Sequence, residues 1–128
     1  MRIVLSGDPR TKKNSQRIIR RGRYSAILPS KAYEEYAADC AVQLAAKGFR
    51  NRGIDYPVNV ACVYFMRTRR RVDLPNLLEA TDDILKDNFV IVDDNCSIVA
   101  THDGSRVEYD KGNPRVEIEI TPIEGAGE

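Results

Sequence analysis

The chain has 128 residues, of which 42% are hydrophobic and 30% are charged, so it is long enough for one compact domain and too short for two. Its formal net charge of +1 gives no indication of a nucleic-acid partner, and the informative feature is how the charges are distributed. Basic residues occur from 10 to 31 without any acid, whereas the segment 73–94 carries seven acids and one lysine. We expect a single domain at 1–123 and a flexible tail at 124–128.

The cysteines and the apolar segments exclude several classes of protein. Three widely spaced cysteines and one histidine are too few for a disulfide framework or a zinc module, so we expect Cys40, Cys62 and Cys96 to be buried free thiols. The first residues contain too short an apolar run for a signal peptide, and no segment approaches the ~20 apolar residues of a membrane span. The sequence therefore indicates a cytoplasmic protein without a membrane partner.

The first half of the chain predicts a strand, a hairpin and a helix. Residues 2–7 form a short apolar run that ends at Gly-Asp-Pro, as is typical of a strand followed by a turn. Residues 17–28 predict an irregular hairpin that turns at Arg21-Gly22. Ser30 is a suitable N-cap for a helix whose apolar residues recur at helical spacing until Gly48.

The second half predicts one central strand, one helix and two further strands. Residues 57–66 alternate and are rich in β-branched and aromatic residues, which favours a central strand. A helix is expected from Pro75 to about Lys86, and strands are expected at 97–109 and 115–121. This order predicts an α/β (α+β) fold in which a mixed sheet packs against two helices.

The helix that begins near Pro75 is predicted to be amphipathic. Asp73 precedes Pro75 by two residues, a spacing that suits an N-cap with proline in the first turn. At 3.6 residues per turn, one face carries Asn76, Glu79, Ala80 and Asp83, and the opposite face carries Leu77, Leu78, Thr81, Ile84 and Leu85. Acids three and four residues apart repel one another, so a cation is expected beside them, and Mg²⁺ prefers such oxygen ligands. The alternative is an ordinary exposed helix whose acids are favoured by capping and the helix dipole.

Two charged segments flank this helix. Asp93-Asp94 follows the apolar run 89–92, and a helix–strand unit would return Asp94 to the beginning of the helix; a polar turn is the alternative. A cluster of carboxylates directly behind a block of arginines is the charge arrangement that a metal-dependent nuclease would need; the basic residues would then bind DNA phosphates, with a solvated charged surface as the alternative. The residues expected to contact DNA are Lys12, Lys13, Asn14, Arg17, Arg20, Arg21, Arg23, Arg69, Arg70 and Arg71.

These residues resemble the RusA family of Holliday junction resolvases. The matching positions, in register, are Asp73, Asn76, Asp83 with Leu85, and Asp93-Asp94 followed by Ile98, together with the loop Lys12-Lys13-Asn14-Ser15-Gln16-Arg17. The resemblance extends from the first strand to about residue 121. It implies a RusA-like fold and a homodimer that binds four-way DNA junctions and makes paired nicks, one per subunit, with Mg²⁺ or Mn²⁺.

The chain departs from the family pattern at two positions. Pro75 stands where the family usually has a second Asp, and Glu79 stands where it usually has a Lys. We expect Glu79 to supply the missing carboxylate, which makes Asp73, Glu79, Asp83 and Asp94 the catalytic acids. Asp73, Glu79 and Asp94 would bind the metal, and Asn76, Asp93 and Arg106 would support them. The missing cation would come from Lys12, Lys13, Arg71 or Arg106.

Two other functions are compatible with the sequence. A non-catalytic junction-binding protein with a degenerate active site would also bind junctions but would not cut them. A phosphohydrolase acting on small nucleotides is disfavoured because the chain has no Gly-rich phosphate loop. A structural role is favoured over general-base catalysis for His102. Tyr33, Tyr36 and Tyr64 are expected in the core, and Tyr24 is the better candidate for stacking on a base.

Overall fold

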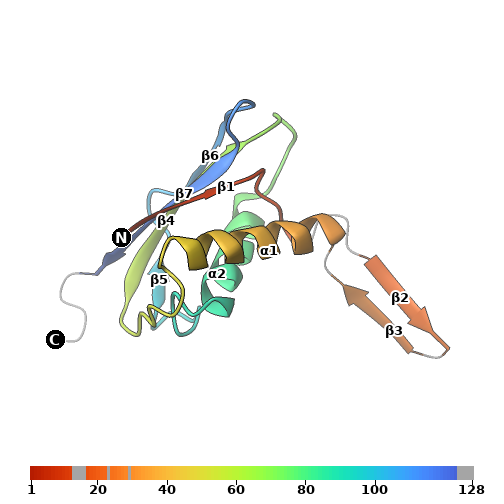
Figure 1. Cartoon of the computed structure of the whole chain (residues 1–128), viewed down its shortest axis with the longest axis horizontal. Coiled ribbons are helices and arrows are strands. Elements are labelled where there is room, and N and C mark those ends of the chain that lie inside the picture. The colour runs from red at the N-terminus through yellow and green to blue at the C-terminus, as the bar shows by residue number, and fades with distance from the viewer. Residues whose placement is uncertain (13–16, 23, 29, 124–128) are drawn as a thin grey trace.

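The computed structural model describes residues 1–12, 17–22, 24–28 and 30–123, and within 17–21 and 24–28 it describes the backbone alone. The expected tail at 124–128 lies outside these residues. The fold is α+β, with a mixed five-stranded sheet and two helices, as predicted (Figure 1).

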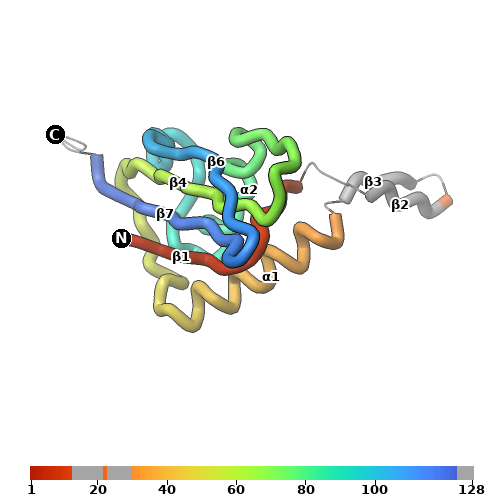
Figure 2. Tube along the Cα trace, turned by 90° about the horizontal axis from the view of Figure 1, so that it is seen from above, coloured from red at the N-terminus to blue at the C-terminus, as the bar shows by residue number. Residues whose placement is uncertain are grey.

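The sheet is built around one long strand. Its strands are β1 (Arg2–Ser6), β4 (Val58–Met66), β5 (Val99–Thr101), β6 (Arg106–Tyr109) and β7 (Arg115–Pro122). β4 pairs with β7 in antiparallel register and with β5 and β6 in parallel register, and β1 pairs with the outer side of β7. β1, β7, β4 and β6 consequently lie side by side in one layer (Figure 2). The expectation that 57–66 is a central strand is confirmed.

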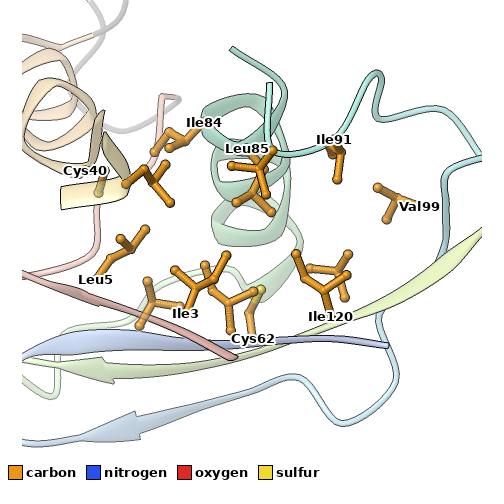
Figure 3. Packing of buried hydrophobic residues seen from close by; sticks show 14 of the residues in the cluster. Ile3, Leu5, Cys40, Cys62, Ile84, Leu85, Ile91, Val99 and Ile120 are labelled. Carbon is orange, nitrogen blue, oxygen red and sulfur yellow. The ribbon is translucent and has the colours of Figure 1, made fainter. Parts of the chain in front are cut away.

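The helices α1 (Lys31–Ala46) and α2 (Leu74–Asp87) bury one face of this sheet. The burial pattern of β4 alternates, so that every second side chain from Val58 to Tyr64 faces the core. Figure 3 shows Ile3, Cys62 and Ile120 directed from the sheet toward the helix layer. Each of these side chains is nearly inaccessible to solvent, so the core that positions α2 is continuous with the sheet.

Both helices begin where the sequence predicts. The Ser30 hydroxyl accepts a hydrogen bond from the Tyr33 backbone N–H at 3.1 Å, and α1 gives way to a left-handed Gly48 with φ of 77°. Asp73 is the N-cap residue of α2, and Pro75 lies in the first turn. The Asp73 side chain makes no capping hydrogen bond, so its carboxylate is available for other contacts.

Several predicted details are wrong. The expected strand 97–109 is two strands, β5 and β6, separated by a turn in which Gly104 has φ of 90°. The run 89–92 forms an isolated bridge between Ile91 and Ile54 and not a strand. Cys96 is exposed because it lies in the turn after residue 95, whereas Cys40 and Cys62 are buried as expected.

The hairpin is more regular than the sequence suggests. β2 (Arg17–Arg21) and β3 (Tyr24–Leu28) pair in an unbroken antiparallel register about the expected turn. Tyr33, Tyr36 and Tyr64 lie in the core as predicted, and the side chain of Tyr24 lies outside the described part of the chain. Among the described residues, no helix is long and apolar enough to cross a membrane.

Candidate active site

Asp83 and Asp94 form a pair of neighbouring carboxyls beside the C-terminal half of α2, which we call the acidic pair. Asp83 belongs to α2, and Asp94 lies in the loop that follows the helix. Burial raises the pKa of the Asp94 carboxyl; the ammonium of Lys86 opposes this rise, and the neighbouring carboxyls of Asp93 and Asp83 add to it. The two acids therefore interact unfavourably unless a cation lies between or beside them.

Two lysines supply positive charge to the acidic pair. Lys12 Nζ lies 2.7 Å from Asp83 Oδ2, and Lys86 Nζ lies 3.8 Å from Asp94 Oδ1. Lys12 also lies 5.6 Å from the centre of the Tyr33 ring, in a cation–π contact. The pKa of the Tyr33 hydroxyl is raised, first by burial and then by the charges of Asp83 and Asp87. The charges of Asp83 and Asp87 therefore reach the Tyr33 hydroxyl, although burial has the larger effect on its pKa.

The structure does not bring all four predicted catalytic acids together. Asp73 and Asp83 are ten residues apart on one helix, so about 15 Å of helix axis separates them. Asp94 lies beside Asp83 and Lys86, and not at the beginning of α2 where Asp73 lies. Glu79 is exposed on α2 between the two ends, one turn before Asp83. The assignment of these acids to catalysis stays a prediction.

The described residues allow a metal site with one or two protein carboxylates, and not one with three or more protein ligands. No group of three or more His, Cys, Asp or Glu side chains in the described part of the chain is arranged to hold a metal ion. Mg²⁺ usually takes only one or two carboxylates from the protein and completes its shell with water and substrate phosphate. The crowded carboxyls of the acidic pair have this donor chemistry, so they fit such an ion.

The residues predicted to support the acids lie at both ends of α2. Asn76 Nδ2 lies 3.4 Å from Asp73 Oδ2, close to the limit of a hydrogen bond. Asp93 Oδ1 accepts a hydrogen bond from the Asp94 backbone N–H at 2.7 Å, which lowers the pKa of Asp93. Arg106 pairs with Glu108 on β6 at 2.8 Å, so the structure places Lys12, and not Arg106, beside an acid of the predicted site.

Some of the predicted DNA contacts lie on the described surface. Arg69, Arg70 and Arg71 are exposed in the segment between β4 and α2, and the Arg69 guanidinium lies 4.2 Å from the centre of the Tyr109 ring. Lys12 contacts Asp83, as described above. The remaining predicted contacts lie outside the described residues or side chains: Lys13, Asn14, Arg17, Arg20, Arg21 and Arg23.

The helix α2 also carries a buried acid that the sequence analysis missed. Asp82 is 7% exposed, and its Oδ2 lies 2.8 Å from His102 Nε2 in the turn between β5 and β6. Asp82 Oδ1 is buried and has no hydrogen-bond partner among the described residues. The hydrogen bond to Asp82 raises the pKa of His102, and burial opposes this rise. Ala80 was predicted on the polar face of α2 and is also buried, because the buried face of the helix is wider than its apolar residues indicate.

The chain matches the model of a known protein family. The family model described as endodeoxyribonuclease RusA matches residues 6–121 of this chain. A search of curated proteins found no match. The matched range contains α2, the acidic pair and the segment from Arg69 to Arg71.

Proposed function

Because the chain belongs to the RusA endodeoxyribonuclease family, which implies Holliday junction resolvase activity, we propose that it resolves four-way DNA junctions by paired symmetric nicks that require Mg²⁺ or Mn²⁺. The observation that carries this proposal is the acidic pair with its lysines, one of which belongs to the basic segment after β1. In this arrangement the carboxylates of the acidic pair would hold a cation, and the lysines beside them would attract a phosphate.

In this proposal, Asp83 and Asp94 hold the metal ion, and Glu79 extends the site by one turn of α2. Mg²⁺ held by these carboxylates would polarise the scissile phosphate and lower the pKa of a water molecule. The chain's own residues do the remaining work. Asp93 fixes the loop of Asp94 through the backbone N–H, and Lys12 and Lys86 carry positive charge at the position where a phosphate must approach.

The two ends of α2 have different roles in this proposal. Asp73 and Asn76 lie at the first turn, where Asn76 supports the Asp73 carboxylate and the arginines that precede the helix would contact the DNA phosphates. A homodimer with two-fold symmetry would present two such sites to the two strands of a symmetric junction. We propose that the protein acts on junctions in the cytoplasm, in recombination and repair.

The second candidate function is junction binding without cleavage. It is favoured by Pro75, which has no carboxylate at a position where the sequence pattern expects one. Wild-type protein with a labelled four-way junction and a matched linear duplex distinguishes the two. We expect symmetric nicks in the junction with Mg²⁺ or Mn²⁺, no nicks with EDTA, and no nicks in the duplex. Tight binding of the junction without nicks in either metal would favour the non-catalytic function.

Glu79→Gln tests whether Glu79 replaces the missing acid. The substitution removes one charge from an exposed position of α2, so the fold should be unaffected. If the carboxylate belongs to the metal site, nicking should fall roughly 100-fold, as expected for the loss of one electrostatic group in an active site. The measurement is the single-turnover nicking rate as a function of Mg²⁺. A near-normal rate at every Mg²⁺ concentration would restrict the site to Asp83 and Asp94.

A further inference from the structure

A basic pocket of about 260 Å³ lies where three segments of the chain meet. These segments are residues 8–11 after β1, the beginning of α1, and residues 66–72 between β4 and α2. The residues with charged guanidinium groups that line this pocket are Arg10, Arg67, Arg70 and Arg71. Asp8 is the one acid among the described residues of the lining, so these residues carry an excess of positive charge.

Asp8 contacts two of the arginines that line the pocket. Its Oδ1 accepts a hydrogen bond from the Arg67 backbone N–H at 3.0 Å, and its Oδ2 lies 3.6 Å from Arg10 Nη2. Among the described side chains, no carboxylate lies within ion-pair distance of the other three guanidinium groups of the lining. Positive groups held together in a hollow repel one another, so the pocket is suited to an anion.

The chemistry and size of the pocket indicate a phosphate group. Planar guanidinium groups bind phosphate with two parallel hydrogen bonds. The positive end of the α1 dipole adds to the field, because Ser30 and Ala32 at the beginning of this 16-residue helix also line the pocket. The volume of about 260 Å³ is below the roughly 300–1000 Å³ of pockets for whole organic ligands, so one phosphate with its waters fits better than a nucleotide.

Three residues of the pocket lining directly precede, in the sequence, residues of the predicted active site or its surroundings. Thr11 in the lining precedes Lys12, which contacts Asp83, and Ala32 precedes Tyr33, which lies under Lys12. Val72 in the lining precedes the N-cap residue of α2. Consecutive Cα atoms are about 3.8 Å apart, so the backbone that lines the pocket lies within one residue of Lys12 and of the N-cap residue of α2.

We infer that this pocket binds one phosphodiester of the DNA strand that is nicked, and that it fixes the register of that strand against α2. This inference rests on the proposed function and adds a defined position to it. A diffuse basic surface attracts every phosphate equally, whereas this pocket singles out one. A neutral methylphosphonate placed at that one position should therefore weaken binding more than at other positions.

The test compares Arg67→Ala/Arg71→Ala with the charge-matched control Arg50→Ala/Arg52→Ala, whose residues are exposed beyond the far end of α1. Binding of a four-way junction is measured in EDTA, for the unmodified junction and for a series with one methylphosphonate each. The pocket variant should bind the unmodified junction about 10- to 100-fold more weakly. The slope of log affinity against log salt should fall by about 1 to 2, and the control should change little.

The decisive measurement is whether the effects of the arginine substitutions and of the methylphosphonates on junction binding are coupled. One position, or two adjacent ones, should weaken binding of the wild type and have no further effect in the pocket variant. Additive effects at every position, or a pocket variant that binds like the control, would overturn the inference while wild-type nicking still supports the proposed function. A wild type that neither binds nor nicks junctions would overturn both.

Thermal unfolding with inorganic phosphate separates a free anion from the DNA backbone. Stabilisation of the wild type by phosphate, together with normal junction binding by the pocket variant, would assign the pocket to a small anion and would contradict the inference. Loss of both responses in the pocket variant is the expected result. Unfolding temperatures of the phosphate-free variants show that each is folded.

Discussion

Asp94→Asn is expected to lower the rate of junction nicking by roughly 100- to 1000-fold, the effect of removing one preorganised charged group from an active site. The carboxyl of Asp94 is crowded by Asp83 and Asp93, and Lys86 Nζ lies 3.8 Å from its Oδ1. Asparagine retains the shape and one oxygen and loses the charge that a divalent cation requires. Asp83→Asn should have a similar effect on nicking, and it also deprives Lys12 of its partner at 2.7 Å.

Asp94→Asn should not destabilise the fold. The pKa of Asp94 is raised in the folded protein from its ordinary value of 3.8, so the folded state binds its proton more tightly than the unfolded state does. The free energy of unfolding therefore decreases as the pH rises from 3.8 through the raised pKa of Asp94. At pH 7 the ionised carboxylate destabilises the folded state. Asn removes this cost, so the unfolding temperature at pH 7 should be unchanged or higher than that of the wild type.

Asp87→Asn is the matched control, because Asp87 is an exposed acid of α2 one turn after Asp83. Single-turnover nicking of a labelled junction and thermal unfolding are measured for all three variants. The combination of lost nicking and retained stability identifies functional acids. Near-normal nicking by Asp94→Asn, with the fold intact, would place the metal away from Asp94 and would favour Asp73 and Glu79 as its ligands.

The elements with strong local signals were predictable from the sequence. The N-caps Ser30 and Asp73 and the alternation along β4 each depend on neighbours within a few residues, and each is confirmed. The break between β5 and β6 has a local signal in Asp103-Gly104, but the choice between a bend and two strands depends on pairing with β4. A sequence pattern contains no information on that pairing.

The site was predictable as a set of residues and not as a geometry. The spacing of acids on α2 is real, but the rise of the helix separates Asp73 from Asp83, and Asp94 joins only one of them. The contact of Lys12 with Asp83 spans 71 residues between those positions in the printed sequence, so no period reveals it. The buried acid Asp82 was missed for the same reason, since its partner His102 lies 20 residues away.

That buried pair gives the largest expected effect on stability. His102→Ala leaves the Asp82 carboxylate buried with neither oxygen paired, because Oδ1 already lacks a partner among the described residues. Removing one member of a buried ion pair costs about 3–5 kcal/mol, and His102 is partly exposed, so we expect the lower value of about 3 kcal/mol. At about 4 °C per kcal/mol for a domain of this size, the unfolding temperature should fall by about 12 °C.

The effect should depend on pH in a defined direction. The pKa of His102 is raised above its ordinary value of 6.5, first by the hydrogen bond with Asp82. A cation stabilised in the folded state contributes fully below pH 6.5, and the contribution is lost as the pH rises through the raised pKa. The difference in unfolding temperature between wild type and His102→Ala should therefore be larger at pH 6 than at pH 9.

The double variant Asp82→Asn/His102→Ala separates the pair from the packing of the histidine ring. Without the buried charge, the loss of the ring should cost less, so the double variant should be more stable than His102→Ala alone. Asp87→Asn should again change the unfolding temperature little, since its side chain is exposed. If His102→Ala unfolds within 2–3 °C of the wild type at pH 6, the Asp82–His102 pair contributes less than about 1 kcal/mol to the free energy of unfolding. The connection between α2 and the turn after β5 would then depend on the apolar core alone.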